Sequence, residues 1–291
     1  MATVSTARCS RVASPSASEQ ADLLNTENTA GNTFTANQNG DEDGFYLNLG
    51  NGSFEDVGAD LGINQPGRTA TQGSVGVAVG DYDNDGLFDF FVTNYQWETN
   101  SLYKNLGNGF FADITFQSGL GVPSLQYLAW GTLFIDYDND GDQDLYVAND
   151  YAPDQLFRND SGTFVDVTSG SGINTLGFAM GASWGDYDGD GDQDLYVSNM
   201  YSKAGRRITE QIPGLDDRMS AVAYGNFLYR NDGDGGMKRM SGADGKSIPV
   251  HLAGWSWGGM FTDFDNDGFL DLYVSSGYYT PPPGQDNGVD L

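Results

Sequence analysis

The sequence contains four copies of a nine-residue pattern, D-x-D-x-D-G-x-x-D, which begin at Asp81, Asp136, Asp186 and Asp263. Each copy places carboxylates at positions 1, 3, 5 and 9 and a glycine at position 6. This spacing lets a loop wrap oxygen ligands around a hard divalent cation, and the glycine permits the sharp turn that the loop needs. Four carboxylates and a carbonyl favour Ca²⁺ over Mg²⁺, which keeps more of its water, so the pattern predicts four Ca²⁺ sites.

Each predicted site consists of four aspartate side chains and the backbone carbonyl at position 7. The residues are Asp81, Asp83, Asp85, Asp89 and the Leu87 carbonyl; Asp136, Asp138, Asp140, Asp144 and the Asp142 carbonyl; Asp186, Asp188, Asp190, Asp194 and the Asp192 carbonyl; and Asp263, Asp265, Asp267, Asp271 and the Phe269 carbonyl. Two like charges about 4 Å apart cost about 1 kcal/mol in water and about 4 kcal/mol at an effective dielectric constant of about 20. We therefore expect the loops to need a cation. The alternative, that the aspartates only cap turns, is open for single positions. A fifth, partial match at 39–44 has Leu47 at position 9, and we predict a turn there, with weak ion binding as the alternative.

The four loops differ from EF-hands at the end of the pattern. An EF-hand has a bidentate Glu at position 12 and flanking helices. Position 12 is a valine in every copy, and each valine closes an apolar run, at 90–92, 145–147, 195–197 and 272–274. These runs do not alternate apolar with polar residues, so they predict strands that are buried on both faces. The sequence thus argues against a helix-loop-helix Ca²⁺ switch.

A second pattern alternates with the Asp loops and predicts β-hairpins. The pentapeptide NLGNG occurs at 48–52 and at 105–109, and related Asn-Asp turns follow at 159–162 and 231–235. Apolar residues flank each turn, and Asn and Gly tolerate the positive φ that tight hairpin turns need. One repeat unit is therefore expected to be a strand, an Asp loop, a second strand and a hairpin.

The repeats predict an all-β chain, a β-propeller of four-stranded blades with calcium loops between the first two strands of each blade. Successive loops begin 55, 50 and 77 residues apart, and 41 Gly, 16 Tyr and 17 Phe suit tight turns and aromatic-rich strands. The units comprise a hairpin half-unit at 45–57, three full units, and a half-unit that ends near Ser276. Two interpretations follow: a ring of four blades closed by both half-units, or an incomplete propeller. The Pro-rich stretch 281–283 and the ending at Leu291 favour the second.

The composition along the chain predicts three parts. They are a disordered or loosely attached N-terminal segment (1–40), the propeller repeats (41–280) with an insertion at about 201–225, and a C-terminal tail (281–291). A solvated loop is the simplest interpretation of the insertion, and a short helix or an excursion over one end of the propeller is the alternative. Residues 1–20 lack the apolar core of a secretory signal, and their Ser, Ala, Thr and Arg bias leaves a transit peptide or a disordered tail open.

The charge and the cysteine content exclude several classes of partner and site. The formal net charge is −28, from 41 acidic and 13 basic residues. Nucleic acids and anionic membrane faces bind proteins whose Lys and Arg neutralise phosphates, so neither is expected as a partner. Cys9 is the only cysteine, which excludes an intramolecular disulfide and a Cys-based metal site. No stretch has the length of apolar sequence that a membrane span needs.

Two pentapeptides match the G-x-S-x-G pattern of serine hydrolases, around Ser183 and Ser256. Both are better explained as blade strands, because Gly181 and Gly258 each stand five residues before an Asp loop, as glycines do in the other two repeats. His251 is the only histidine. The alternative to a non-enzymatic module is a carbohydrate-active enzyme, such as a polysaccharide lyase, with His251 as base or with Ca²⁺ polarising a uronate.

These loops, apolar strands and hairpins resemble the FG-GAP/VCBS repeats of integrin-α-like propellers. Within those, Leu-Tyr-Arg-Asn-Asp at 228–232 and Ala-Gly-Trp-Ser-Trp-Gly at 253–258 resemble the cartilage acidic protein family and its ASPIC/UnbV relatives, over about residues 45–280. The resemblance implies a propeller, usually of seven blades, with Ca²⁺ in the loops, in proteins that are mostly secreted or surface-bound and bind other molecules. The chain departs from the family in having fewer repeats, no recognisable ASPIC/UnbV segment and no signal sequence.

The residues and the resemblance together predict a calcium-binding interaction or adhesion module with a protein or carbohydrate ligand. Loops of this kind commonly work at the Ca²⁺ levels outside cells, so we expect an extracellular or periplasmic location for the parent protein. Neither a nucleic-acid partner nor a membrane span is expected.

Overall fold

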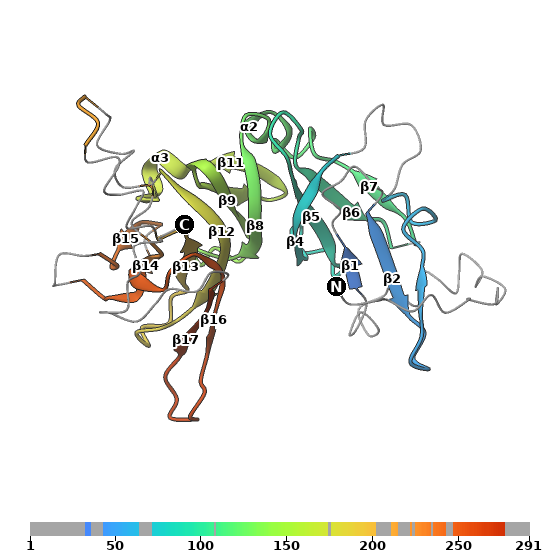
Figure 1. Ribbon diagram of the computed structural model, residues 1–291. Coiled ribbons are helices and arrows are strands. Elements are labelled where there is room, and N and C mark those ends of the chain that lie inside the picture. Colours follow the sequence, from blue (N-terminus) through green and yellow to red (C-terminus); the bar gives the residue numbers. More distant parts are fainter. Residues whose placement is uncertain are drawn as a thin grey trace, which may run out of the picture.

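The computed structural model describes most of the repeat region. The described residues are 33–35 (backbone), 43–63, 72–107, 109–173, 176–201, 211–214, 222, 225–233, 235–242 and 247–276. The chain is all-β, and its strands form successive antiparallel sheets that we call blades 1 to 5 in chain order (Figure 1). Each of the three complete blades is a strand, an Asp loop, a second strand and a hairpin, which is the predicted repeat unit.

The strands of each blade follow the order of the sequence. Blade 1 contains β1 (Thr33–Thr35), β2 (Gly44–Asn48) and β3 (Phe54–Asp56); blade 2 contains β4 (Ser74–Gly80), β5 (Asp89–Asn94), β6 (Ser101–Asn105) and β7 (Phe111–Asp113); blade 3 contains β8 (Leu128–Ile135), β9 (Asp144–Pro153), β10 (Gln155–Asp160) and β11 (Thr163–Asp166); blade 4 contains β12 (Leu176–Gly185), β13 (Asp194–Asn199), β14 (Phe227–Asn231) and β15 (Met237–Arg239); and blade 5 contains β16 (Ser256–Thr262) and β17 (Asp271–Ser276). Blades 3 and 4 share one sheet, because the end of β9 pairs with the start of β12 through Leu176↔Pro153.

Short helical turns connect the blades. They are α2 (Gly121–Ser124), α3 (Thr168–Ser171) and a 3₁₀ helix (Val250–Leu252). Among the described residues, no helix has both the length and the apolar character to span a membrane.

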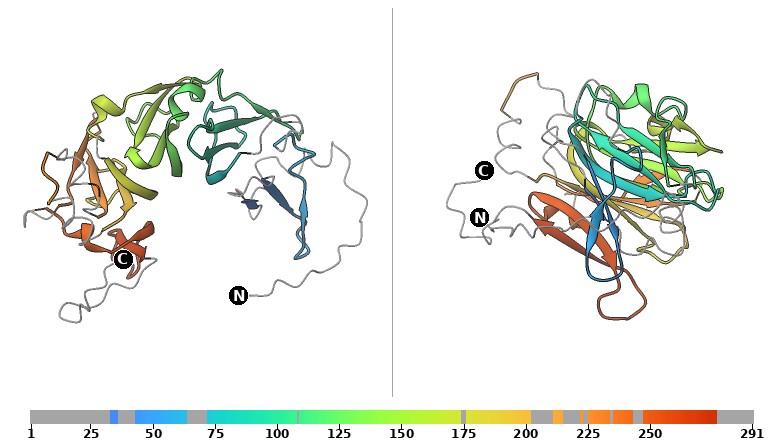
Figure 2. Two further views of the ribbon diagram at one scale, coloured as in Figure 1. Left: turned by 45° about the horizontal axis from the view of Figure 1, so that its top comes forward. Right: turned by 90° about the vertical axis from the view of Figure 1, so that its right-hand side faces the viewer.

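The five blades follow one another round an open arc, with β1–β3 at one end and β16–β17 at the other (Figure 2). The two half-units predicted from the sequence lie in separate sheets and do not pair with each other. The fold is therefore an incomplete β-propeller, and the four-bladed ring closed by both half-units is wrong. β1, which pairs with β2 through Phe34↔Phe45, is a third strand of blade 1 that the sequence analysis did not predict.

The strands that follow the Asp loops are buried on both faces in blades 2 to 4. Every residue of β5 and β13 is buried, as are the first seven residues of β9. The prediction fails for β17, where Tyr273 is 58% exposed although its equivalents Tyr146 and Tyr196 are 0% exposed. Among the described residues, β17 pairs only with β16 and no further blade covers it, so the same sequence pattern has no partner surface there.

The hydrophobic core lies in layers between successive blades. Phe45 of blade 1 packs against Phe90 of blade 2, and their ring centroids are 5.5 Å apart in an edge-to-face arrangement. Phe91 of blade 2 belongs to the next layer with Val147 of blade 3, and a third layer joins blades 3 and 4. Because the layers lie between sheets, each complete blade depends on its neighbours for burial.

The first strands of successive blades approach each other through glycine. A Cβ on Gly131 would lie 2.7 Å from the Cα of Gly181, and a Cβ on Gly181 would lie 2.8 Å from the carbonyl oxygen of Trp257. The register of each first strand shifts beside its glycine, as in a β-bulge. Within the described part of the chain, a Cβ on the equivalent Gly258 would lie near Ser275 Oγ alone, at 3.7 Å. The glycines that recur before the loops thus permit backbone-to-backbone contact between blades.

Gly181→Ala is expected to lower the free energy of unfolding by about 1 to 3 kcal/mol, because the backbone of blade 5 must move to admit the methyl group. Gly258→Ala is the matched control, since it changes the same repeat position in a place with room. Chemical denaturation at a fixed Ca²⁺ concentration would measure both variants. Equal losses in the two variants would contradict the close approach.

The predicted boundaries of the three parts stay predictions. Residues 1–32 and 277–291 lie outside the described residues, and so does most of the insertion at 201–225. The partial fifth loop lies outside them up to residue 42, and its Asp43 accepts a hydrogen bond of 2.9 Å from Ser74 Oγ.

Candidate metal centres

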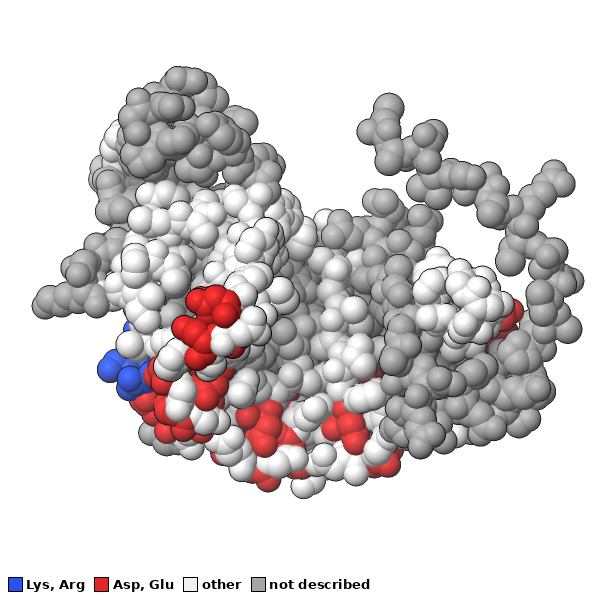
Figure 3. All heavy atoms as spheres, turned by 90° about the horizontal axis from the view of Figure 1, so that it is seen from below, with Lys and Arg blue, Asp and Glu red and all other residues white. Residues whose placement is uncertain are grey.

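All four Asp loops connect the first two strands of a blade, where the sequence predicted them. They span 81–88 between β4 and β5, 136–143 between β8 and β9, 186–193 between β12 and β13, and 263–270 between β16 and β17. Acidic side chains gather in clusters along one face of the molecule (Figure 3).

The aspartate at position 1 organises each loop. In the second loop, Asp136 accepts hydrogen bonds from the backbone N–H groups of Asp140 and Gly141, at 3.1 and 3.0 Å. The same pair of bonds recurs at Asp81, Asp186 and Asp263. The position-6 glycine has a positive φ in every loop, for example 95° at Gly141, a conformation that glycine adopts without steric cost. The repeated motif therefore folds each loop into the same turn.

The aspartate at position 9 is buried and connects the loop to the hairpin. Asp144 is 0% exposed, and it accepts one hydrogen bond from the N–H of Tyr137 at 3.1 Å and one from the N–H of Asn159 in β10 at 2.7 Å. Asp89 and Asp194 do the same with the third strands of their blades. Asp271 is exposed, and among the described residues it accepts a hydrogen bond only from the N–H of Phe264. In blades 2 to 4, which contain the hairpin, one carboxylate thus connects the first turn of the loop to the third strand.

Burial makes the position-9 carboxylates difficult to ionise. Desolvation raises the pKa of Asp89 and of Asp144 to about 7 and that of Asp194 to about 6, against the opposing effect of the backbone N–H donors. Desolvation, followed by repulsion from Asp140, also raises the pKa of Asp138. A divalent cation beside these groups would favour their charged forms and remove much of this penalty.

The structure brings three aspartates of each loop close together, with one carboxylate oxygen from each lying within 4.8 Å of the others. The groups are Asp81, Asp83 and Asp85; Asp136, Asp138 and Asp144; Asp186, Asp188 and Asp194; and Asp263, Asp265 and Asp271. Loops 2 to 4 therefore contribute positions 1, 3 and 9, and loop 1 contributes positions 1, 3 and 5. The remaining predicted side-chain ligands are Asp89, Asp140, Asp190 and Asp267. The three at position 5, which are Asp140, Asp190 and Asp267, each accept a hydrogen bond through one oxygen from the backbone N–H of the residue at position 7.

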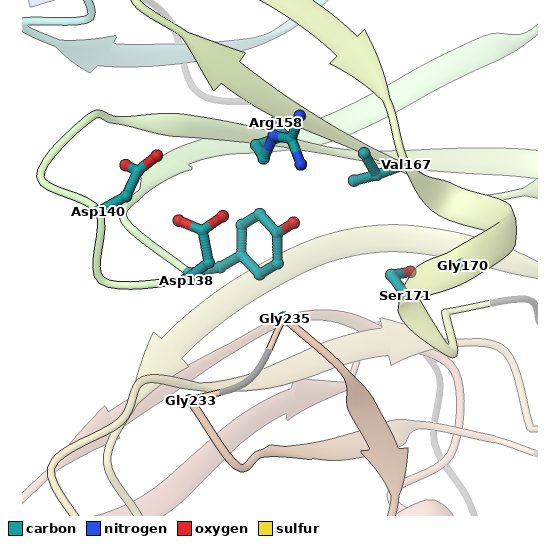
Figure 4. Close-up of a pocket in the computed structure, with 9 residues that line it drawn as sticks. Asp138, Asp140, Arg158, Val167, Gly170, Ser171, Gly233 and Gly235 are labelled. Atoms are coloured by element: carbon teal, nitrogen blue, oxygen red, sulfur yellow. The ribbon is translucent and has the colours of Figure 1, made fainter.

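The donor set fits a hard cation. Asp83 Oδ1 and Asp138 Oδ1 are buried atoms without a hydrogen-bond partner, although both belong to the three-aspartate groups. A buried carboxylate oxygen that accepts no hydrogen bond is costly unless an ion neutralises it. Carboxylates and a carbonyl are the ligands that Ca²⁺ prefers. Asp138 and Asp140 also line a hollow of about 420 Å³, with Arg158 at its margin and Gly233 and Gly235 of the next blade on the other side (Figure 4).

The first three loops are linked to one another by side chains that the sequence analysis did not assign. Asn84, at position 4 of the first loop, donates to Asp142 Oδ1 at 2.9 Å, and Asn139 donates to Asp192 Oδ1 at 2.8 Å. Both acceptors stand at position 7 of the following loop. The third loop has Gly189 at position 4 and the fourth has Phe269 at position 7, so this pairing cannot continue. The sequence signal for these bonds is an Asn at position 4 of one loop together with an Asp at position 7 of the next loop.

A second connection crosses the blades through the hairpin asparagines. Asn159 of blade 3 donates to the carbonyl of Tyr82 in the first loop at 2.6 Å and to the carbonyl of Gln143 at 2.9 Å. Asn231 of blade 4 donates to the carbonyl of Tyr137 in the second loop at 2.7 Å. Both asparagines are fully buried. The hairpin of each of these blades therefore holds the Asp loop of the blade before it.

Comparison with known protein families identifies a repeat in this chain. A model of the FG-GAP-like repeat matches residues 33–92 and 136–197, which include the first three Asp loops. The chain carries FG-GAP-like repeats. The matched regions contain three of the four Asp loops, the apolar strands that follow them and the hairpin turns at 48–52 and 159–162, so the resemblance to FG-GAP repeats is confirmed.

The chain is similar in sequence to cartilage acidic protein 1. The identity is 28% over 250 residues to the Xenopus tropicalis protein, covering 81% of this chain and 33% of that protein. The identity to the Mus musculus and Homo sapiens proteins is 26%, covering 77% of this chain and 31% of each. The chain thus spans about a third of the length of these relatives.

Two solved structures are similar to parts of this chain. One is a lectin of Agrocybe aegerita, described for its recognition of non-reducing terminal N-acetylglucosamine, with 12% identity, a TM-score of 0.36, and coverage of 85% of this chain and 76% of that one. The other is the V. cholerae biofilm matrix protein Bap1, with 15% identity, a TM-score of 0.33, and coverage of 74% and 30%.

Asn159→Ala is expected to destabilise the fold by about 1 to 3 kcal/mol, because it leaves two buried carbonyls without their donor. Asn105→Ala is the matched control in blade 2, where the same side chain donates, among the described residues, only to the Phe88 carbonyl of its own blade, at 3.2 Å. Urea unfolding midpoints in Ca²⁺ would separate the two. A loss for Asn105→Ala as large as that for Asn159→Ala would contradict a role between blades.

Proposed function

We propose that the chain is a calcium-stabilised propeller segment of an extracellular interaction or adhesion module, whose ligand is a protein or a glycan. The observation that supports it most directly is the repeated group of three carboxylates within 4.8 Å at the start of each second strand. The name of the similar relatives, cartilage acidic protein 1, also suits an extracellular location. Ca²⁺ sites of extracellular modules are saturated only at the Ca²⁺ levels found outside cells.

The role proposed for Ca²⁺ is to hold neighbouring blades together. The first and second loops each receive the hairpin asparagine of the next blade, and each bonds to the next loop. A cation that neutralises the first loop therefore also acts on the contact between blades 2 and 3. Ion binding of this kind stabilises the folded state and needs no change of fold.

The serine-hydrolase pattern has a structural explanation. Ser183 lies within β12 and Ser256 within β16, and no helix directly follows either strand in the described chain. Ser256 is 0% exposed, accepts a hydrogen bond from Asn226 at 3.1 Å and donates to the Ala253 carbonyl at 3.3 Å. These contacts favour strands over a nucleophile elbow.

One form of the lyase alternative would use His251 as its base. His251 is only 5% exposed, and burial, followed by the charge of Arg239, lowers the pKa of its imidazole. A general base must reach the proton that it removes, and this side chain is covered. The burial of His251 therefore favours the binding module over a lyase that uses this histidine as its base.

Removal of Ca²⁺ with EDTA is expected to lower the Tm by on the order of 10 °C. Each site at ten times its Kd contributes about 1.4 kcal/mol, and each kcal/mol corresponds to roughly 2 to 4 °C for a domain of this size. Differential scanning calorimetry with EDTA, Ca²⁺ or Mg²⁺ would measure it, and Ca²⁺ should restore the Tm more fully than Mg²⁺. An unchanged Tm would contradict the proposal.

Binding to a ligand is expected to depend on Ca²⁺. Screening of the chain on glycan arrays and on extracellular matrix proteins, with Ca²⁺ and with EDTA, should give binding only in Ca²⁺. Release of unsaturated sugar products from a uronate polysaccharide would instead favour the lyase.

A further inference from the structure

The third strands of blades 2, 3 and 4 carry a basic residue at the same position of the hairpin. These residues are Lys104, Arg158 and Arg230. In blade 3, Arg158 donates through Nε and Nη2 to the two carboxylate oxygens of Asp160, at 2.8 and 3.1 Å. In blade 4, Arg230 Nε lies 2.7 Å from Asp232 Oδ1. Each arginine is thus held by the aspartate two residues further along its own hairpin.

Blade 2 has no such aspartate, because Leu106 occupies that position in the NLGNG turn. Lys104 instead reaches the first Asp loop. Its Nζ forms ion pairs with Asp83 Oδ2 and with Asp85 Oδ2, the second at 3.0 Å. It also lies 5.9 Å from the centroid of the Tyr82 ring. Two of the predicted ligands of the first loop therefore contact a cation that belongs to the chain itself.

The first loop differs from the second in the same region. The three aspartates that converge in the first loop are at positions 1, 3 and 5, and Asp85 at position 5 is a partner of Lys104. In the second loop the third member is the position-9 aspartate. There, Asp138 and Arg158 line the same hollow (Figure 4). Arg158 pairs with Asp160.

We propose that Lys104 is the internal counter-ion of the first Asp loop, and that it makes this loop a weaker Ca²⁺ site than the second and third loops. The inference rests on the proposed function, because it concerns the relative affinity of the proposed sites. Lys104, Asp83 and Asp85 have side chains that are 27%, 18% and 33% exposed, so solvent screens their interaction only in part. A Ca²⁺ ion that uses both carboxylates must displace the ammonium group. When the Ca²⁺ concentration is low, the ammonium group of Lys104 still neutralises part of the negative charge of the loop.

Lys104→Met tests the proposal in the full chain. Isothermal titration should show one site that binds Ca²⁺ about tenfold more tightly than in the unsubstituted protein, since the charge of the ligand set governs affinity. Arg158→Met is the matched control, and it should change the affinities much less because Arg158 pairs with Asp160. In an Asp81→Asn background, which disables the first loop, Lys104→Met should leave the remaining sites unchanged.

A second readout separates a counter-ion from a merely structural lysine. Lys104→Met should lower the Tm in EDTA, where the loop loses its only cation, and should have little effect or raise the Tm in saturating Ca²⁺. A lysine that only supports the fold would lower the Tm under both conditions, which would overturn the proposal.

The reciprocal substitution Asp160→Leu gives blade 3 the turn residue of blade 2. It should free Arg158 to approach Asp138 and Asp140 and thereby weaken Ca²⁺ binding at the second site.

Two outcomes distinguish a failure of the proposed function from a failure of the counter-ion proposal. If the protein binds no Ca²⁺, the proposed function fails; if it binds Ca²⁺ and Lys104→Met leaves every affinity unchanged, only the counter-ion proposal fails.

Discussion

The repeat depends on the hydrogen bonds that the buried aspartate at position 9 of the Asp loop accepts. Its carboxylate accepts an N–H from the start of the Asp loop and an N–H from the third strand, so it joins the loop, the second strand and the hairpin. Because it is removed from water, its charge is costly, and its pKa rises to about 7 in blades 2 and 3. A cation at the loop would relieve that cost. The carboxylates would then serve both the geometry of the blade and the binding of the ion.

The contacts between blades explain why the arc holds its curvature. First strands meet through glycine at Gly131 and Gly181, aromatic and aliphatic layers fill the spaces between sheets, and Asn159 and Asn231 reach from one hairpin into the loop of the previous blade. Blade 5 shows the same sequence without such a partner. β17 has the apolar pattern of the inner strands, yet its residues are partly or fully exposed. Burial in this fold is therefore a property of adjacent blades.

Much of the fold was accessible from the sequence, because the repeat unit has short-range signals. The Asp loops, the apolar runs that follow them and the Asn-Gly turns specify a strand, a loop, a strand and a hairpin within about 40 residues. Contacts between repeats were less accessible. The bonds from Asn84 to Asp142 and from Asn139 to Asp192 join residues in different repeats. Lys104 contacts the Asp loop because its own hairpin has Leu106 in place of an aspartate. The pattern that the repeats share does not reveal this difference between them.

The sequence by itself determined the all-β class, the repeat unit and the positions of the carboxylates, because period, turn residues and ligand spacing are local properties of the chain. The tertiary structure decided which carboxylates converge, which become buried, and that the two half-units lie at opposite ends of an open arc. These properties depend on the packing of one blade against the next, which places residues of different repeats together. Burial and electrostatic cost are set by that packing, and a local pattern cannot specify them.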